Sequence, residues 1–415
     1  MDSTFFIVYE IFIATVFFAF CTWLYFLFYM IKSFKQSPIL EEIKFNTYIH
    51  PKVSIIIPAL NEENNITKCL DNLLTQDYPN FEIVAVNDSS FDTTGEIMHT
   101  YRARNSKRIL VITAKPKPVD WVGKSWACYQ GYLHASGEIF VFLDADTTLC
   151  SPSAISLAVI YLIEQKLDAL TARPKIICDN IWTKIMLPLL WTFSHVKYSS
   201  LSINNAKSKT GYFFGCFYLI TRKTYESIGT HKAVKREIVE DAALGQKVKQ
   251  QKFKLKMVRG EHCISTKMTG DFMTFWQGLK RSVNMIPFGS KDIPNICLVF
   301  FLLLEPFILL PFSLHLVLMD SSSTSEDKNL LGQILLVVDL MSIVLIISVI
   351  AIQLSIGLFL SPIYALFSPI ACAIISIGFI LAIVKSRRRG TTIRWRGREY
   401  VITEKIYSTA HPKNK

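Results

Sequence analysis

The stretch "EIFVFLDADTT" (Glu138 to Thr148) decides the fold class of this chain. An apolar run from Ile139 to Leu143 has the length of a buried strand, and it stops at two aspartates, Asp144 and Asp146. Upstream, β-rich runs at 53–57, 81–86 and 108–113 alternate with helical patterns at 65–76, 93–104 and 124–135. This alternation predicts βαβ units and a parallel sheet, which binds ligands at the carboxyl ends of its strands.

Downstream, the same α/β texture continues to about residue 290. We expect a helix over 181–203, a strand over 212–220, a helix that opens at Glu240 and a short strand near 253–258. The chain is therefore divided into four expected parts: a membrane anchor with a linker (1–50), an α/β domain (51–290), a C-terminal membrane region (291–384) and a basic cytosolic tail (385–415).

A long apolar run precedes the α/β region. Hydrophobic residues make up 51% of the 415 positions, which is high for a soluble protein. The run from Phe5 to Ile31 is long enough to span a bilayer. Because no Lys or Arg precedes it, we interpret it as a retained anchor rather than a signal peptide, with its N-terminus outside and Lys32 and Lys35 inside. A buried helix of a soluble protein is the alternative.

Three apolar segments follow the α/β region, at 295–319, 330–354 and 356–384. Three crossings would place the basic tail on the side opposite to the α/β region, against the positive-inside tendency. The first segment contains Glu305, Pro306 and Pro311, so we predict that it is broken, re-entrant or interfacial and does not cross. The last two would then form a hairpin that turns near 355–362. Three full crossings are the alternative.

Charge and cysteine usage exclude some classes of protein. The net charge is +12, and much of the basic charge lies beside the apolar segments, as on the cytoplasmic flank of a membrane protein. No basic–aromatic groove pattern accompanies it, so no nucleic-acid partner is expected. The nine cysteines contain no Cys-x-x-Cys pair, which argues against a zinc or disulfide framework and suits a reducing compartment.

Acidic side chains collect where the predicted strands end. Asp144 and Asp146 can converge on one Mg²⁺ or Mn²⁺, which takes oxygen ligands and leaves positions for a diphosphate. Glu62 follows the first strand and Asp88 follows the second, which suggests a pocket for ribose hydroxyls and base N–H groups. The alternatives are solvated turns, helix caps and compensation of helix dipoles.

Three motifs carry a resemblance to a known family. They are "VSIIIPALNEENNITKCLDNLLTQDYPNFEIVAVNDSSFDTT" (53–94), "FLDADTT" (142–148) and "EIVEDAALG" (237–245). In this order they resemble the inverting glycosyltransferases of family 2, over roughly residues 52–290. "DWVGKSWACYQG" (120–131) and "IRWRGREY" (393–400) are similar to a membrane-bound subgroup. That subgroup includes carotenoid- and hopanoid-associated glycosyltransferases and, more distantly, ceramide glucosyltransferase.

The resemblance implies an α/β fold of the GT-A type, a Rossmann-like nucleotide-sugar-binding domain with flanking transmembrane helices. Asp241 would be the catalytic base, with Glu240 beside it. Asp146 would be the main ligand of Mn²⁺ or Mg²⁺, and Asp144 would touch the ribose or the metal. The positions that correspond to donor-binding residues of the family are Ala59, Glu62, Asp88, Lys124 and Asp144.

Two departures from the family pattern limit what it implies. Many relatives have a second Asp where this chain has Asn87, so one nucleotide contact would be weaker. Gln277 and Arg281 do not have the spacing of the Gln-x-x-Arg-Trp motif of processive relatives, and no Trp follows them. This difference argues against a polysaccharide synthase.

These observations predict an integral membrane inverting glycosyltransferase whose catalytic domain faces the cytoplasm. It would transfer a single sugar from a nucleotide-diphospho-sugar, with UDP-sugars expected first, to a lipid-like acceptor. One alternative is transfer to a polyprenyl phosphate, whose ionised oxygen needs little help from a base. The other is a non-catalytic membrane component that binds sugar nucleotides.

Overall fold

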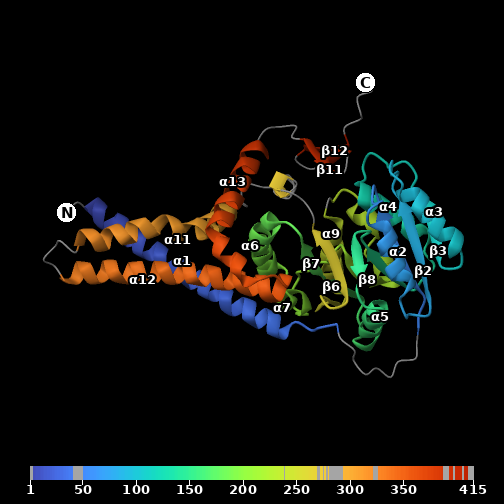
Figure 1. Ribbon diagram of the computed structural model, residues 1–415, viewed down its shortest axis with the longest axis horizontal. Coiled ribbons are helices and arrows are strands. Elements are labelled where there is room, and N and C mark those ends of the chain that lie inside the picture. The colour runs from blue at the N-terminus through green and yellow to red at the C-terminus, as the bar shows by residue number, and fades with distance from the viewer. Residues whose placement is uncertain are drawn as a thin grey trace. The chain divides into compact units, whose positions relative to one another are not determined.

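The protein is described from a computed structural model, in which the chain divides into two compact units (Figure 1). The sheet unit comprises Gln36–Ile177, Lys197–Met268 and Arg389–Lys415, and the helix unit comprises Met1–Lys35, Cys178–Val196 and Thr269–Arg388. Cys178–Val196, expected inside the α/β domain, groups with the apolar helices, and most of the expected end of that domain, 269–290, lies outside the described residues. The described residues are 3–40, 50–237, 239–268, 272–273, 275–276, 279, 293–320, 326–386, 392–395, 398–403 and 406–409.

A seven-stranded sheet forms the centre of the sheet unit, in the order β3-β2-β1-β4-β8-β6-β9. Its strands are β1 (Val53–Ala59), β2 (Phe81–Asn87), β3 (Ile109–Thr113), β4 (Ile139–Leu143), β6 (Ala169–Arg173), β8 (Phe217–Thr221) and β9 (Leu255–Arg259). β1 to β4 pair in parallel, as predicted. β8 runs antiparallel to both β4 and β6, so the sheet is mixed beyond the four strands that were predicted to be parallel. Apolar patterning reports burial, whereas strand direction depends on the connection, which before β8 is long and includes the helices over 181–197 and 200–204.

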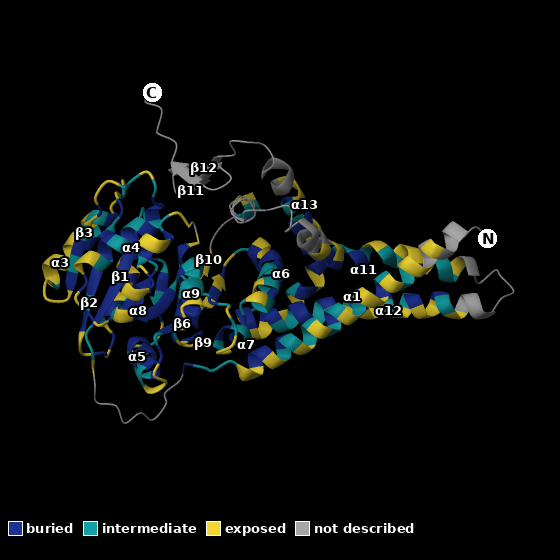
Figure 2. Cartoon of the chain, turned by 180° about the vertical axis from the view of Figure 1, so that it is seen from behind, coloured by how far each residue is buried: buried dark blue, intermediate teal, exposed yellow. Residues whose placement is uncertain are grey.

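Helices cover both faces of this sheet. They are α2 (Ile66–Leu74), α3 (Thr94–Arg104), α4 (Gly123–His134), α5 (Ala154–Glu164), α7 (Ser200–Asn204), α8 (Arg222–Ser227), the 3₁₀ turn η1 (His231–Val234) and α9 (Glu240–Gln250). Successive side chains of a strand point to opposite faces. Ile55 and Ile57 therefore join the core under α2 and α5, and Ile56 joins the core under α4. The strands are accordingly buried on both sides (Figure 2).

Two small sheets complete the sheet unit. β5 (Thr147–Leu149), β10 (Ile264–Met268) and β7 (Lys175–Cys178) form one, and β11 (Thr392–Trp395), β12 (Arg398–Thr403) and β13 (Ile406–Thr409) form the other. The sequence pattern predicted neither these strands nor α5 and β6. β5 spans three residues, which is too short to show a period.

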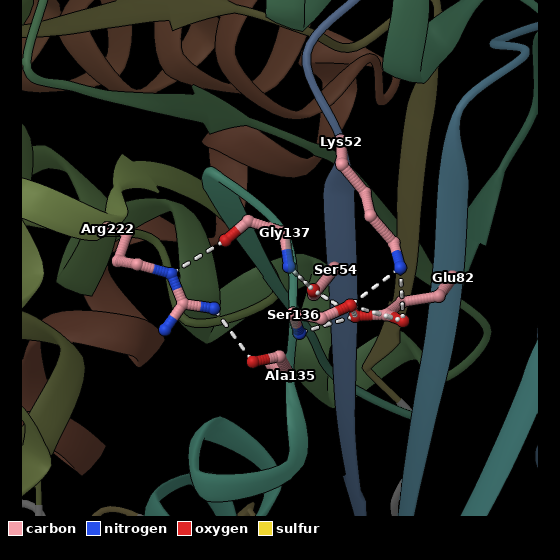
Figure 3. A network of polar contacts seen from close by, with 7 residues as sticks. All are labelled: Lys52, Ser54, Glu82, Ala135, Ser136, Gly137 and Arg222. Carbon is pink, nitrogen blue, oxygen red and sulfur yellow. Dashed lines mark hydrogen bonds and ion pairs between the residues drawn. The ribbon is translucent and has the colours of Figure 1, made fainter.

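A polar network closes the amino edge of the large sheet, opposite to the edge at which ligands are expected (Figure 3). The Glu82 carboxylate accepts hydrogen bonds from Ser54 Oγ (2.6 Å) and from the Ser136 N–H (2.6 Å), and it pairs with Lys52 (3.1 Å). Arg222 donates to the carbonyl oxygens of Gly137 (2.9 Å) and Ala135 (2.7 Å). These bonds connect β1, β2, α8 and the loop before β4, and they fix the register of the sheet from its far end.

His231 lies in the apolar core beneath α4 and is fully buried. Its Nδ1 bonds to the Tyr225 hydroxyl (2.6 Å), and its Nε2 lies 3.5 Å from the Tyr218 hydroxyl. Burial, helped by the positive charge of Lys124, lowers the pKa of His231 from 6.5 to about 3. The side chain therefore stays neutral in the folded protein and acts as a structural histidine.

His231 is expected to make the folded state less stable as the pH falls below 6.5. Below pH 6.5 the unfolded chain binds a proton at His231 that the folded chain does not bind. The free energy of unfolding therefore falls by up to about 1.4 kcal/mol per pH unit. His231→Gln should flatten this slope, whatever its effect at neutral pH. Thermal unfolding of both proteins between about pH 7 and pH 5 checks this, and equal slopes would contradict it.

The helix unit consists mainly of long apolar helices. They are α1 (Ser3–Gln36), α6 (Ile181–Lys197), α11 (Ile293–Asp320), α12 (Glu326–Ile352), a π-helical turn η2 (Gln353–Leu358), the 3₁₀ turn η3 (Pro362–Phe367) and α13 (Ser368–Ser386). Among the described residues, four segments are long and apolar enough to cross a membrane: Glu10–Gln36, Phe301–Leu318, Leu330–Leu358 and Pro362–Leu381.

The predicted break in the segment 295–319 is wrong, because α11 is one continuous helix through Pro306 and Pro311. Each proline removes one hydrogen bond within the helix, but a packed apolar helix tolerates this loss. α11 lies side by side with α12 (Figures 1 and 2). The chain does turn near 355–362, as predicted. However, α13 then leads steeply away from α12 instead of running back along it (Figure 1).

Candidate active site

The carboxyl ends of three neighbouring strands form one edge of the large sheet. β1 lies between β2 and β4 and is parallel to both, so Ala59, Asp88 and Asp144 occupy adjacent strand tips. The Asp88 N–H donates to the Ala59 carbonyl oxygen over 2.8 Å and ties the first two tips together. The structure thus places these residues at one edge, where α/β sheets bind ligands, and their roles remain predictions.

The loops after β1 and β2 are joined by side-chain hydrogen bonds into one rim. The Glu62 N–H donates to Thr94 Oγ1 (2.8 Å), and the buried Glu62 carboxylate accepts from Asn65 Nδ2 (2.8 Å). Asn87 Oδ1 accepts from the Ser90 N–H (2.9 Å), so this side chain shapes the loop. Asn87 therefore has a structural role in this loop, which the resemblance to the family motifs did not suggest.

Two residues of this rim have left-handed backbone conformations. Asn61 has a φ of 56° and Ser89 a φ of 63°, and neither is glycine. Such conformations cost on the order of 1 kcal/mol or more, and they persist where surrounding bonds hold them. Here the Asn61 N–H donates to Ser90 Oγ (3.0 Å), and Asn61 Oδ1 accepts from the Phe91 N–H (3.1 Å). The rim is therefore a preorganised loop pair that closes one side of the sheet edge.

Asp144 and Asp146 lie on the tight turn between β4 and β5. The Thr147 N–H donates to the Asp144 carbonyl oxygen (3.0 Å), which closes the turn. β5 pairs antiparallel with β10, so the chain after Asp146 is held in place as well. Burial raises the pKa of the Cys69 thiol, and the charges of Asp146, Asp144 and Glu62 raise it further. The carboxylates that follow β1 and β4 therefore lie close enough together to affect the same buried thiol.

Lys124 connects three elements at this edge. It lies in the first turn of α4, and its Nζ is 2.7 Å from Asp144 Oδ1 and 3.2 Å from Glu240 Oε1. Burial by itself would lower the pKa of Lys124, but Asp144, Glu240 and Asp241 together raise it well above its ordinary value. The ammonium group is thus charged at neutral pH, and it lies among three carboxylates at the edge of the sheet.

Asp241 is the second residue of α9, and its carboxylate lies near Lys124 as well. Its Oδ1 accepts from the Ala242 N–H (2.7 Å), which fixes the orientation of the carboxylate. A side-chain Cβ at Gly215 would lie 2.1 Å from Asp241 Oδ2 and 3.2 Å from Lys124 Nζ. Gly215 therefore leaves the space that Asp241 occupies. The structure brings Lys124, Asp144, Glu240 and Asp241 into one cluster from β4, α4 and α9.

The two carboxyl groups of α9 have raised pKa values. Burial raises the pKa of Glu240 to about 7, against the opposing charge of Lys124. Burial also raises the pKa of Asp241, again opposed by Lys124. A base whose pKa lies nearer to neutrality accepts a proton more readily than an ordinary exposed aspartate does. The cluster therefore has the electrostatics of a proton-accepting site beside a fixed cation.

Sequence reasoning missed two parts of this cluster. Glu240 was placed beside the base but not recognised as the second partner of Lys124, which lies 116 positions earlier in the chain. Gly215 was read as part of a strand over 212–220, whereas β8 begins at Phe217. The signal for Gly215 was present, because a glycine inside an apolar strand pattern marks a close approach of other groups.

Comparison with known proteins tests the resemblance that the motifs suggest. Residues 54–240 match the family model described as "Glycosyl transferase family 2". These residues form a glycosyltransferase family 2 domain. The matched segment begins in β1 and ends at Glu240, so it contains the strand-tip residues and Lys124. The resemblance predicted from the motifs is thereby confirmed.

Curated relatives from Staphylococcus aureus are named 4,4'-diaponeurosporenoate glycosyltransferase. The protein of strain USA300 is 26% identical over 255 residues, which is 60% of this chain and 65% of that protein. The protein of strain bovine RF122 / ET3-1 is 28% identical over 223 residues, which is 53% of this chain and 56% of that protein. The chain thus matches less than two thirds of the length of either relative.

One solved structure shows the same fold as this chain. It is the mannosyltransferase PcManGT from Pyrobaculum calidifontis in complex with GDP-Man and Mn²⁺. The TM-score is 0.54 at 17% identity, and the match covers 91% of this chain and 98% of the other. The prediction of a GT-A α/β domain flanked by apolar helices is confirmed.

Proposed function

We propose that the protein is an integral membrane inverting glycosyltransferase that transfers one sugar from a nucleotide-diphospho-sugar to a lipid-like acceptor. The observation that carries the proposal is the cluster at the sheet edge, in which Lys124 lies between Asp144 and Glu240 with Asp241 beside them. A family 2 domain with this cation and these carboxylates contains the groups that an inverting transfer needs.

In this proposal, Asp241 takes the proton from the acceptor hydroxyl as that oxygen attacks the anomeric carbon. No covalent sugar–enzyme intermediate is needed, because attack comes from the face opposite to the diphosphate. Lys124 neutralises charge that develops on the leaving diphosphate. Glu240 is a positioning residue, since its buried carboxylate holds the ammonium group of Lys124 from the other side. Ala59, Glu62 and Asp88 would line the nucleotide along the rim.

Asp144 and Asp146 would hold a divalent metal ion, Mn²⁺ or Mg²⁺. The donor set fits such an ion, because two carboxylates on one turn supply hard oxygen ligands. Within the described part of the chain, no group of three or more His, Cys, Asp or Glu could hold a metal, so these two carboxylates are the ligands that we propose. When bound, the ion would act as a Lewis acid on the diphosphate. The mannosyltransferase of similar fold contains Mn²⁺ and GDP-Man.

The acceptor is proposed to be a lipid for two reasons. The domain is part of a chain with four helical segments apolar enough to cross a membrane, so it would work at a bilayer surface. The curated relatives are named for 4,4'-diaponeurosporenoate as the molecule that receives the sugar. Transfer to a polyprenyl phosphate is the second candidate within this class, and a non-catalytic sugar-nucleotide-binding component is the alternative outside it.

Purified protein should release nucleotide diphosphate and label a lipid in a metal-dependent way. The assay offers UDP- and GDP-sugars with Mn²⁺ or Mg²⁺ and a total lipid extract. Chelation of the metal and Asp146→Ala should each abolish most of the transfer, because the diphosphate would lose its counter-charge. Asp71→Ala, at an exposed aspartate of α2 outside the rim, is the matched control. Donor binding without turnover in any extract would contradict the proposal and favour the non-catalytic alternative.

We also propose that the catalytic domain faces the cytoplasm and that α1, α11 and α12 cross the membrane. α11 and α12 are adjacent helices of nearly equal length, so they should cross together or not at all. The tail strands β11 to β13 belong to the same compact unit as the catalytic sheet. An even number of crossings must therefore separate them, and α13 would stay on the cytoplasmic side. The basic residues after α1 and α13 then face the cytoplasm.

Thiol labelling in intact cells tests this topology. We expect Ser323→Cys to react with a membrane-impermeant maleimide in intact cells, and Lys413→Cys to react only after permeabilisation. The exposed native thiols of Cys21 and Cys150 are first replaced by serine. Labelling of both positions in intact cells would mean that α13 crosses as well. Protection of position 323 would mean that α11 does not cross.

A further inference from the structure

A cavity of about 400 Å³ lies between α1 and α11 in the helix unit. Its walls are almost entirely apolar and include Ile11 and Phe12 of α1 and Phe301 and Ile308 of α11. Ile11 and Ile308 are each more than half exposed, so the cavity opens at the lipid-facing surface of the two helices. Its volume falls in the range of ligand pockets, about 300–1,000 Å³.

One side chain in this apolar wall carries an ionisable carboxyl group. Glu305 lies within the candidate span Phe301–Leu318 and is only 3% exposed. Neither of its carboxyl oxygens has a hydrogen-bond partner. A polar group buried without a partner costs about 1–3 kcal/mol, and a carboxyl group inside a membrane costs more. Such a residue inside a membrane marks a functional site by default, and a ligand that bonds to it would recover this cost.

The chemistry of Glu305 selects the polar group of that ligand. A carboxylate only accepts hydrogen bonds, whereas a protonated carboxyl also donates one. A hydroxyl group both donates and accepts, so it satisfies Glu305 in either state. A charged headgroup belongs at the membrane surface rather than inside an apolar span. A metal ion is equally unsuited, because Glu305 is the sole carboxylate among the described residues that line the cavity.

We propose that the α1–α11 cavity binds a long-chain lipid that carries a hydroxyl group, with the hydroxyl bonded to Glu305. The chain fills the apolar hollow beside Phe12 and Ile308, and the carboxyl group of Glu305 fixes its depth. The inference rests on the proposed membrane crossing of α1 and α11 but not on the transferase activity, because binding is measured without a sugar donor. It adds a lipid site in the helix unit to the nucleotide site in the sheet unit.

The test uses the full-length protein in lipid nanodiscs and two photoreactive probes. One is hexadecanol with a diazirine in its chain, and the other is the same molecule with hydrogen in place of the hydroxyl. Mass spectrometry locates the cross-links. We expect the alcohol to label peptides of α1 and α11 about two- to tenfold more efficiently than the hydrocarbon, the range that one net hydrogen bond allows.

Four variants separate the role of Glu305 from a general effect on folding. Glu305→Leu should abolish the preference for the alcohol, and it should fold, because leucine is favourable inside a membrane span. Glu305→Gln should keep the preference. Ile308→Trp should fill the cavity and reduce labelling by both probes. Gln353→Leu removes another buried polar side chain without a hydrogen-bond partner, and Gln353 does not line the cavity, so labelling should not change.

Several outcomes would overturn the proposal. Equal labelling of the wild-type protein by both probes would show an apolar groove without selectivity for a hydroxyl group. A preference that survives Glu305→Leu would place the hydroxyl elsewhere. Cross-links that join two protein chains at α1 or α11 would show that a second copy of the chain covers the cavity. None of these results would bear on the proposed transferase, since Asp241→Asn should bind the alcohol probe as the wild type does.

Discussion

Asp241→Asn is expected to lower the rate of sugar transfer by about 10²–10⁴-fold, the contribution of a positioned general base. The amide has nearly the shape of the carboxylate and can still accept from the Ala242 N–H. It cannot take up the proton of an acceptor hydroxyl. Donor binding should be retained, because the rim residues and Lys124 are unchanged. The loss should therefore appear in kcat rather than in the KM for the donor.

The measurement is a steady-state transfer assay beside a direct donor-binding titration. Asp120→Asn is the matched control, since Asp120 is a partly exposed aspartate of the same domain that pairs with Lys235 outside the cluster. It should transfer sugar at nearly the wild-type rate. If Asp241→Asn also keeps most of the activity, the acceptor oxygen must already be ionised. That result would favour the polyprenyl phosphate alternative over a neutral hydroxyl.

The first half of the sheet unit was predictable because each element there is simple. β1 to β4 are short apolar runs separated by helical patterns of similar length, so the period of each segment is clear. The region from Ser151 to Asn180 is different. β6 and β7 are separated by Pro174 alone, and α5 is nearly all apolar, so neither shows a face. The sequence pattern of such segments does not distinguish a helix from a strand. Which strands β6 and β7 pair with depends on the rest of the folded sheet.

The same limit separates the predicted from the unpredicted parts of the site. Asp144 could be named because it follows a local signal, the end of a strand, whereas Asp241 was named from its position in a motif that resembles the family. The pairing of Glu240 with Lys124 could not be named, because it depends on how α4 and α9 meet across the sheet edge. The prediction for α11 was wrong for the opposite reason, because a clear local signal was overridden by packing. Pro306 and Pro311 are reliable breakers in an isolated helix, but packing against α12 maintains the helix through both.

Gly215→Ala is expected to reduce sugar transfer by about 10²-fold, although the residue itself takes no part in the chemistry. The added Cβ would lie 2.1 Å from Asp241 Oδ2, which is closer than any real contact. The carboxylate would have to move, and a catalytic group displaced by about 1 Å costs roughly this factor. The fold should persist, because the clash involves the end of one side chain rather than the backbone.

Gly332→Ala is the control for this prediction, and thermal unfolding is measured for both variants. A Cβ at Gly332 would meet its nearest atom at 3.5 Å, an ordinary contact, so activity should not change. Gly332 lies inside α12, where alanine stabilises a helix by up to about 1 kcal/mol relative to glycine. If Gly215→Ala unfolds the domain, loss of activity would say nothing about Asp241, and the prediction of a local effect would be wrong.

The double variant Gly215→Ala with Asp241→Asn decides whether the glycine acts through the aspartate. If Gly215 matters only because it leaves space for the Asp241 carboxylate, the two losses should not add, and the double variant should be no slower than Asp241→Asn alone. If the losses multiply, the methyl group must also disturb another group. Lys124 Nζ would lie 3.2 Å from the new Cβ and is the first candidate. A rise in the KM for the donor would then identify Lys124, because displacement of the cation weakens contact with the diphosphate.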